Sequence, residues 1–167
     1  MNKQELYAYL KKKGVAFEAV EHPPVFTVEE ADALQLPNPE VGAKNLFLRD
    51  SKKSRYYLLT MRDHQQVRIR DFQHAIDAKP LSFASEEDLM KIMGLIKGSV
   101  TPFGALNDEA RIVTVYFDDF YRGNIISVHP NENTATIYLQ ADDLISLLQE
   151  HGNEVHFISL EGLSGEE

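Results

Sequence analysis

The sequence of 167 residues contains no cysteine. The protein therefore cannot carry a disulfide scaffold, a thiol nucleophile or a zinc site with cysteine ligands. No apolar run approaches the roughly 20 residues that a membrane-spanning helix needs, and the polar segment Met1–Glu5 lacks the apolar core of a signal peptide. We therefore expect a cytoplasmic protein with no membrane contact.

Positive charge is also scarce, with 17 Lys and Arg residues against 26 Asp and Glu residues and a formal net charge of −9. This excess of acid works against a general attraction to nucleic acid, although it allows a local basic patch. The common catalytic signatures are missing as well. There is no Gly-x-Ser-x-Gly elbow, no glycine-rich phosphate loop and no His-Glu-x-x-His helix, and the six histidines are not spaced like metal ligands. We expect no metal and no cofactor, and the inventory alone assigns no reaction.

Apolar residues make up 43% of the chain, as in an ordinary soluble domain. Capping residues, apolar periodicity and turn residues predict alternating groups of helices and strands. Helices are expected from the Asn2 cap to Gly14 and over Val28–Leu36, Asp71–Ala78, Ser85–Met93 and Ala141–His151. Strands are expected over Val15–Val20, Ala43–Leu48, Tyr56–Met61, Val67–Ile69, Ile112–Phe117, Ile125–Val128, Thr134–Leu139 and Glu154–Leu160. This order indicates a mixed α/β (α+β) fold, with a single domain over residues 1–160 built on one central, largely antiparallel mixed sheet flanked by helices, and an acidic tail over residues 161–167.

Three local features could carry chemistry. Lys44 and Asn45 begin an otherwise apolar strand, where a cation and an amide can meet a phosphate or a carbonyl, or can simply face water. The loop Gly98–Pro102 can present backbone N–H groups to an oxyanion, or can be an ordinary connection. His129 ends a strand beside a turn, where a histidine can orient a substrate or lie on the surface.

Four segments in this order resemble the free-standing prolyl-tRNA editing proteins, which are relatives of the YbaK family and of the editing domain inserted in bacterial prolyl-tRNA synthetases. The segments are His22–Thr27, Gly42–Leu48, Gly98–Gly104 and Ser127–Thr136. The resemblance covers roughly residues 6–148, and its motifs are specific because of their order. It implies a YbaK-like fold and an enzyme that hydrolyses the ester of mischarged tRNA(Pro) in trans, because a synthetase pocket rejects a smaller amino acid by only about 1–3 kcal/mol.

The resemblance also implies roles for individual residues. Lys44 corresponds to the lysine that holds the terminal adenosine or its phosphate, and Asn45 is its neighbour in the pocket. Gly98 belongs to the loop that holds the aminoacyl carbonyl and orients water, and His129 to the opposite wall, where it positions the amino acid or the ribose hydroxyl. The remaining substrate-binding residues implied are those that bound the pocket or continue the loop: Phe26, Thr27, Ser99, Val100, Thr101 and Pro102.

The implied chemistry is attack by a positioned water, without a metal or a covalent intermediate. The branch that clears alanine is the closest in motif, and the YbaK branch that clears cysteine is the alternative. A non-catalytic module that binds charged tRNA or a synthetase, and a hydrolase of small amino-acid esters, are further alternatives. The expected partners are the acceptor end of tRNA(Pro) and prolyl-tRNA synthetase, and we expect a monomer. Many of the cations lie within residues 11–70, which could form one face for the acceptor stem.

Overall fold

The computed structural model describes residues 1–163; residues 164–167, the end of the expected acidic tail, lie outside the described residues. The helices are α1 (Lys3–Lys12), α2 (Val28–Ala33), α3 (Ile69–Ala75), α4 (Glu86–Met93) and α5 (Ala141–His151). The strands are β1 (Phe17–Glu21), β2 (Ala43–Asp50), β3 (Tyr56–Arg62), β4 (Leu81–Phe83), β5 (Val113–Asp118), β6 (Ile125–Val128), β7 (Ala135–Gln140) and β8 (Val155–Ile158). Short 3₁₀ helices cover Pro39–Val41, Pro102–Asn107 and Asp119–Tyr121. No helix in this part of the chain has the length and apolar character that crossing a bilayer requires.

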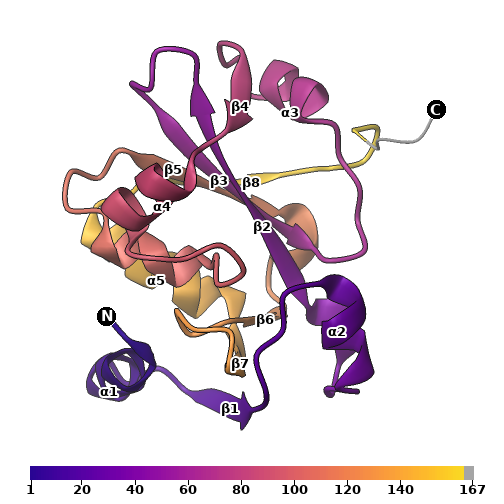
Figure 1. The fold of residues 1–167 in the computed structure, drawn as a ribbon, viewed down its shortest axis with the longest axis vertical. Coiled ribbons are helices and arrows are strands. Elements are labelled where there is room, and N and C mark those ends of the chain that lie inside the picture. The colour runs from indigo at the N-terminus through magenta and orange to yellow at the C-terminus, as the bar shows by residue number, and fades with distance from the viewer. Residues whose placement is uncertain (164–167) are drawn as a thin grey trace.

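The strands form two sheets rather than the single sheet expected from the sequence (Figure 1). A five-stranded mixed sheet has the order β4-β2-β3-β5-β8, in which β2 is antiparallel to β3 and β4, while β5 is parallel to β3 and β8. A three-stranded antiparallel sheet has the order β1-β7-β6. An isolated bridge between Gly42 and Ser127 joins the two sheets at the start of β2. The mixed α/β class is confirmed, and the strands are shared between two sheets because β6 meets β2 only at this bridge.

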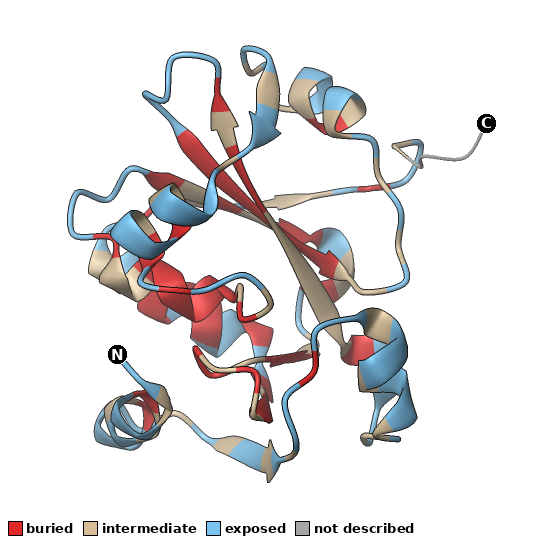
Figure 2. Cartoon of the chain, in the orientation of Figure 1, coloured by how far each residue is buried: buried red, intermediate tan, exposed pale blue. Residues whose placement is uncertain are grey.

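Two clusters of buried apolar residues cover the two faces of the five-stranded sheet, and Figure 2 shows much of the interior strand β3 as buried. Leu58 packs with α4, α5 and the smaller sheet, whereas its neighbour Leu59 packs with Phe72 of α3 on the opposite face. Successive strand residues point to opposite faces, so an interior strand covered on both sides becomes apolar at every position. This explains why all residues of Tyr56–Met61 are buried. The larger core cluster lies between the two sheets and therefore sets the distance between them.

Most local signals give the element that they predict. Ser85 caps α4 by accepting a hydrogen bond from the Asp88 N–H at 3.0 Å, and α5 has the expected bounds and ends at Gly152, whose φ is +111°. The expected helix over Val28–Leu36 ends three residues early, at Ala33, and Gln35 then adopts a φ of +52°.

One expectation in the middle of the chain is wrong, and one short strand there was not predicted. The segment Val67–Ile69 forms no strand, because Ile69 begins α3 and its apolar neighbours instead pack against the core beneath that helix. The short edge strand β4 was not expected, since Leu81–Phe83 is only three residues long and Phe83 is exposed. Residues 161–163 of the expected tail are described and continue the fold, with the Arg68 N–H donating to the Leu163 carbonyl at 3.3 Å.

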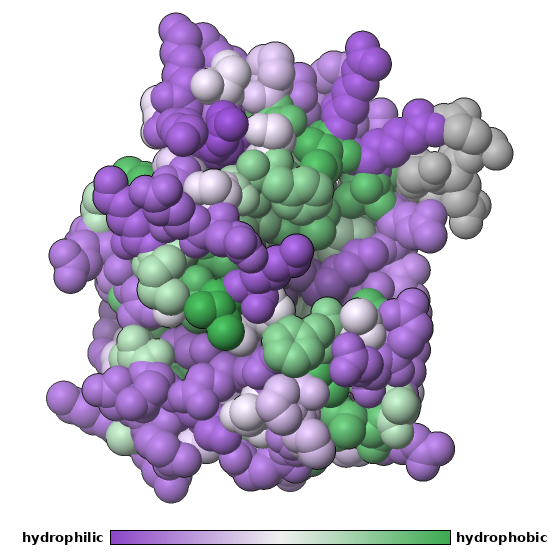
Figure 3. All heavy atoms as spheres, viewed as in Figure 1, coloured by the Kyte–Doolittle hydropathy of each residue, from purple (hydrophilic) through white to green (hydrophobic). Residues whose placement is uncertain are grey.

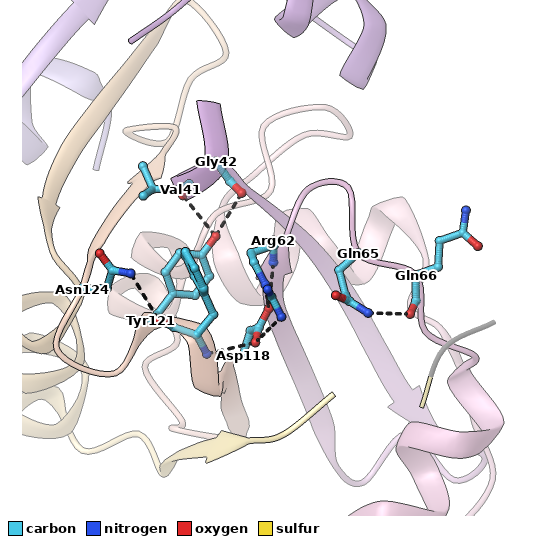
Figure 4. Close-up of polar contacts among 9 residues, drawn as sticks. Val41, Gly42, Arg62, Gln65, Gln66, Asp118, Tyr121 and Asn124 are labelled. Atoms are coloured by element: carbon cyan, nitrogen blue, oxygen red, sulfur yellow. Dashed lines mark hydrogen bonds and ion pairs between the residues drawn. The ribbon is translucent and has the colours of Figure 1, made fainter. Parts of the chain in front are cut away.

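Two polar contacts, one at the start of β2 and one at the paired end of β3, hold this end of the hairpin, as Figure 4 shows. The Tyr121 hydroxyl lies 3.1 Å from the Val41 carbonyl oxygen and 2.9 Å from that of Gly42. At the end of β3, Arg62 Nε donates to Asp118 Oδ2 at 2.8 Å, and the guanidinium also lies over the Phe120 ring. These contacts hold the end of the β2–β3 hairpin on which Lys44 stands, and they commit the Arg62 guanidinium to a partner inside the fold.

Candidate functional site

A cavity of about 640 Å³ lies along the free edge of β2. Strand β4 pairs with β2 only from Leu48 to Asp50, so the part of β2 from Ala43 to Phe47 has no neighbouring strand on that side. The cavity wall is completed by α2, the start of α4 and the loop before the 3₁₀ helix Pro102–Asn107. Figure 3 shows apolar surface gathered around a hollow in the middle of this face, within an otherwise hydrophilic surface.

A second cavity of about 590 Å³ adjoins the first. The wall residues common to both are Ala31, Ala43, Asn45, Asp63 and His129. The two hollows therefore lie side by side, and these shared residues from α2, β2, the end of β3 and the end of β6 form the partition between them. A ligand with two parts, such as an amino acid joined to a nucleoside, can occupy such a pair of spaces.

Seven of the ten residues expected from the sequence line the first cavity: Phe26, Thr27, Lys44, Asn45, Gly98, Val100 and His129. They come from four segments that are far apart in the chain and that the fold brings together. The other three, Ser99, Thr101 and Pro102, are buried beside the loop and do not line the cavity. The Thr101 hydroxyl caps the following 3₁₀ helix by accepting from the Phe103 N–H at 3.4 Å.

Lys44 is half-buried in this wall. Burial lowers the pKa of its ammonium, and the nearby charge of Asp63 opposes that shift. Within residues 1–163 the Lys44 side chain makes no hydrogen bond or ion pair, so its donors remain available to a ligand. A partly dehydrated cation without a partner is a site at which an anion or a carbonyl oxygen binds favourably.

The loop Gly98–Pro102, part of which lines the same cavity as Lys44, is held in shape by Asn45 and by Gly98. The Asn45 amide donates to the Val100 carbonyl at 3.2 Å. Gly98 has a φ of +92°, and a Cβ at this position would come within 3.0 Å of the Phe26 ring. Glycine therefore allows both the backbone turn and the close approach of the ring.

The backbone donors of this loop are only partly used inside the fold. The Ser99 N–H donates to the Ile96 carbonyl at 3.0 Å and closes a turn. In the described part of the chain, the N–H groups of Gly98 and Val100 have no acceptor. Both residues line the cavity. Two unpaired backbone donors in one cavity wall are the kind of group that stabilises a developing oxyanion.

His129 is held in one tautomer. Its Nδ1 lies 3.0 Å from the Ala135 carbonyl oxygen, and since a carbonyl can only accept, Nδ1 carries the proton. Burial lowers the pKa of the His129 imidazole, with a smaller contribution in the same direction from His22, although the hydrogen bond to Ala135 opposes the shift. The ring is therefore neutral at neutral pH, and its Nε2 is left as a hydrogen-bond acceptor.

The segment that carries Phe26 is anchored from the far side of the site. Buried Asn133 donates its amide to the Val25 carbonyl at 2.9 Å, and Thr27 caps α2 by accepting from the Glu30 N–H at 3.0 Å. Phe26 itself is 64% exposed, although it lies against Gly98. The segment His22–Thr27 is thus held at the cavity by a side chain of the segment Ser127–Thr136.

Sequence reasoning missed several residues of the wall. Asp63 directly follows β3, and burial raises the pKa of its carboxyl group. In the sequence it stands between Arg62 and His64 and reads as part of an exposed turn. The missed apolar members are Val25, Val28, Ala31, Ala43, Phe47, Phe83, Ala84 and Leu89, and the missed charged members besides Asp63 are Glu86 and Lys97. No group of three or more His, Asp or Glu side chains that could hold a metal ion occurs among residues 1–163.

Comparisons with known proteins place the chain among similar sequences and folds. Residues 22–147 match the model of the family described as the aminoacyl-tRNA editing domain. The chain is 40% identical over 159 residues to the prolyl-tRNA editing protein ProX of Acetoanaerobium sticklandii, covering 95% of this chain and 97% of that protein. It is 32% identical over 162 residues to the prolyl-tRNA synthetase associated domain-containing protein 1 of Bos taurus, covering 90% of this chain and 92% of that one. A crystal structure described as a candidate trans-editing enzyme for prolyl tRNA synthetase shares the fold, with a TM-score of 0.68 at 19% identity over 92% of this chain and 93% of that one.

Proposed function

This chain belongs to the aminoacyl-tRNA editing domain family, and from that premise we propose that it is a trans-editing hydrolase that cleaves the ester of mischarged tRNA(Pro). The relative ProX is named a prolyl-tRNA editing protein and is similar over nearly its whole length. We propose that residues 1–160 form the editing domain and that residues 161–167 follow it as a tail whose first residues, 161–163, lie against that domain. The proposed partners are the acceptor end of tRNA(Pro) and prolyl-tRNA synthetase. We propose that the protein is a monomer and acts in the cytoplasm.

The observation that carries the proposal is the meeting of Lys44, Gly98 and His129 on one cavity. These residues lie on β2, on the loop after α4 and at the end of β6, and nothing in their separation along the chain requires them to meet. The cavity wall around them is mostly apolar. It supplies two cations, Lys44 and Lys97, that have no hydrogen-bond or ion-pair partner among residues 1–163, together with the two unpaired N–H groups of the loop and the acceptor Nε2 of His129. An ester carbonyl, a ribose hydroxyl and a phosphate need this set of groups.

The proposed roles follow from these groups. Lys44 binds the phosphate or the hydroxyls of the terminal adenosine. The N–H groups of Gly98 and Val100 bind the ester carbonyl and stabilise the oxyanion that forms when water attacks it. His129 Nε2 accepts a hydrogen bond from the attacking water or from the free ribose hydroxyl, and so orients it. An aminoacyl ester is already activated, so this positioning is sufficient and no covalent enzyme intermediate is needed.

We propose alanine as the amino acid that is removed. The apolar wall formed by Val25, Val28 and Ala31 suits a methyl side chain and offers no partner for a larger polar one. A cysteine side chain is close to alanine in size, so hydrolysis of Cys-tRNA(Pro) is the alternative. Rejection of proline requires that its rigid pyrrolidine ring clash with this wall. A comparison of the hydrolysis rates of alanyl-tRNA(Pro) and prolyl-tRNA(Pro) tests this steric requirement.

The negative net charge is compatible with tRNA as a partner if the contact is small and local. Lys3 pairs with Glu21, Lys13 with Glu150 and Arg62 with Asp118, so part of the cationic charge is neutralised within the fold. The turn between β2 and β3, with Lys52 and Lys53, is exposed. We expect weak binding whose affinity falls as salt is added, because each phosphate contact releases a counterion.

A panel of tRNA(Pro) molecules charged with alanine, cysteine, serine or proline tests the proposal. We expect fast hydrolysis of the alanyl ester and none of the prolyl ester above the uncatalysed rate. Faster release of cysteine would support the alternative, and equal rates on all four would contradict selective editing. Tight binding of alanyl-tRNA(Pro) with an intact ester would instead identify a non-catalytic binding module. Hydrolysis of alanine methyl ester without tRNA would identify a hydrolase of small esters.

A further inference from the structure

The carboxylate of Asp63 is placed unlike the other acids around the cavities. It lines both hollows, whereas Glu86 lines only the first and Asp32 only the second. Its side chain is 21% exposed, against 50% for Asp32, and Glu86 is also exposed. An anion that is partly removed from water gains more from a cationic partner than an anion at the surface does. The position therefore favours a positively charged group of a ligand that reaches the partition between the two spaces.

Asp63 and Lys44 lie on the same face of the β2–β3 hairpin. Lys44 is paired with Met61, and the Asp63 N–H donates to the Gly42 carbonyl at 2.9 Å, two residues further along both strands. Residues opposite one another, and residues two apart on one strand, point to the same side. The two charges do not form an ion pair, yet each shifts the pKa of the other toward the charged form. An anion and a cation thus stand beside the same space without neutralising one another directly.

The backbone is shaped around the Asp63 carboxylate. Gly42 lies beneath it, and a Cβ at Gly42 would come within 2.5 Å of Asp63 Oδ2. The φ of Gly42 is −61°, which any residue can adopt, so what glycine provides here is space for the carboxylate and not a special backbone conformation. The other basic group near the carboxylate among the described residues is His64, whose Nε2 is 3.5 Å from Oδ1 but whose side chain is 63% exposed.

We propose that the Asp63 carboxylate binds the α-ammonium group of the aminoacyl ester. This rests on the proposed function and adds to it the class of ester that the site accepts, namely esters with a free, protonated α-amine. The acceptor end of a charged tRNA carries an ammonium on one side of the ester and phosphates on the other. Asp63 and Lys44 present the opposite charges to the same cavity, and the loop at Gly98, which would bind the carbonyl, lines that cavity too. Esters that lack the ammonium charge should be poor substrates.

Lactyl-tRNA(Pro) is the matched probe, because its ester has a hydroxyl where alanine has the ammonium and is otherwise almost the same size. The full chain and its Asp63→Asn variant are assayed on alanyl-tRNA(Pro) and lactyl-tRNA(Pro), with the uncatalysed rate of each ester subtracted. We expect Asp63→Asn to lower kcat/KM for the alanyl ester by about tenfold or more and to change that for the lactyl ester less than twofold. Equal losses on both esters would show a merely structural role and overturn the inference, as would no loss on either.

Two further variants sharpen the test. Gly42→Ala keeps the carboxylate but displaces it, so it should reproduce the alanyl-specific loss of Asp63→Asn. Glu86→Gln removes an exposed carboxylate of the same cavity and should leave the ratio of the two rates unchanged. If Glu86→Gln lowers kcat/KM for the alanyl ester as strongly as Asp63→Asn does, Asp63 does not bind the ammonium specifically and the inference is overturned.

Binding of non-hydrolysable amides separates this inference from the proposed hydrolysis. The probes are 3′-deoxyadenosine carrying a 3′-alanylamino or a 3′-lactylamino group. A preference for the alanyl amide that disappears in Asp63→Asn supports the inference even in a protein that hydrolyses no ester, a result that would overturn the proposed function alone. Ester hydrolysis without such a preference would overturn the inference alone. Failure to bind either amide, together with an absence of hydrolysis, would overturn both.

Discussion

The side-chain amide of Asn45 donates a hydrogen bond to the Val100 carbonyl, 3.2 Å away, and thereby ties β2 to the loop that forms the facing wall of the cavity. The oxygen of the same amide accepts a hydrogen bond from the buried Thr60 hydroxyl at 2.6 Å. Both ends of the amide are used, which fixes its orientation and with it the distance from Lys44 to the loop. Asn45 is thus a positioning residue that joins the two walls.

Replacing Asn45 with Ala should therefore affect both stability and activity. It leaves the Thr60 hydroxyl and the Val100 carbonyl without a partner, and we expect the free energy of unfolding to fall by about 1–3 kcal/mol. The loop also loses its tie, so kcat/KM for the ester should fall. Thr60→Val is the matched control, since it breaks the other hydrogen bond of the amide but leaves the loop attached. Denaturant titrations and initial rates of both variants check this, and equal losses of activity would contradict a tethering role.

The Gly98 position should be sensitive to a single methyl group. Gly98→Ala imposes a φ of +92° on an L-residue and also drives a Cβ to within 3.0 Å of the Phe26 ring. Gly123 has a φ of +69° with nothing within 4 Å of an added Cβ, so Gly123→Ala carries the backbone strain alone. We expect both variants to lose about 1–2 kcal/mol of stability. Only Gly98→Ala should lose ester hydrolysis, and full activity in that variant would contradict the role of the loop.

His129 should make stability depend on pH in a defined direction. Its pKa is lowered by burial in the folded protein, so the unfolded chain binds the proton more readily. The neutral His129 imidazole therefore contributes its full share of the free energy of unfolding above the ordinary histidine pKa of 6.5. This share is lost as the pH falls below 6.5 toward the lowered pKa of the folded protein. His129→Asn keeps a donor for the Ala135 carbonyl but cannot titrate. The wild type should therefore lose more stability than this variant between pH 7.5 and pH 5.5, and parallel losses would contradict a buried, neutral imidazole.

Local signals in the sequence are sufficient to predict a helix or a turn where a single residue type sets its end or its shape. The Ser85 cap, Gly152 after α5 and the charged turn between β2 and β3 act within a few residues, and the structure contains the elements that they predict. Packing between segments that are far apart in the chain cannot be predicted from such local signals. The short apolar segment Val67–Ile69 has the composition of a strand, but it finds its burial against the core beneath α3.

The candidate site was foreseen through its resemblance to a family, not through the chemistry of single residues. Lys44 and His129 each have an ordinary explanation in the sequence, and only the fold places them on one cavity. Asp63 escaped notice because an acid beside Arg62 and His64 is typical of a surface turn. Gly42, just before β2, leaves room for its carboxylate, and this contact depends on the register of β2 and β3 and cannot be read along the chain.

The most direct test of the account is the rate at which Lys44→Ala hydrolyses alanyl-tRNA(Pro), measured beside wild type and Lys79→Ala, which removes an exposed lysine that does not line the cavity. Lys44 makes no hydrogen bond or ion pair within residues 1–163, and its ammonium is partly dehydrated, so the free energy of unfolding of Lys44→Ala should stay within about 1 kcal/mol of wild type. The account predicts that Lys44→Ala loses hydrolysis while it stays folded and that Lys79→Ala keeps it. A folded Lys44→Ala protein with the wild-type rate would contradict the account.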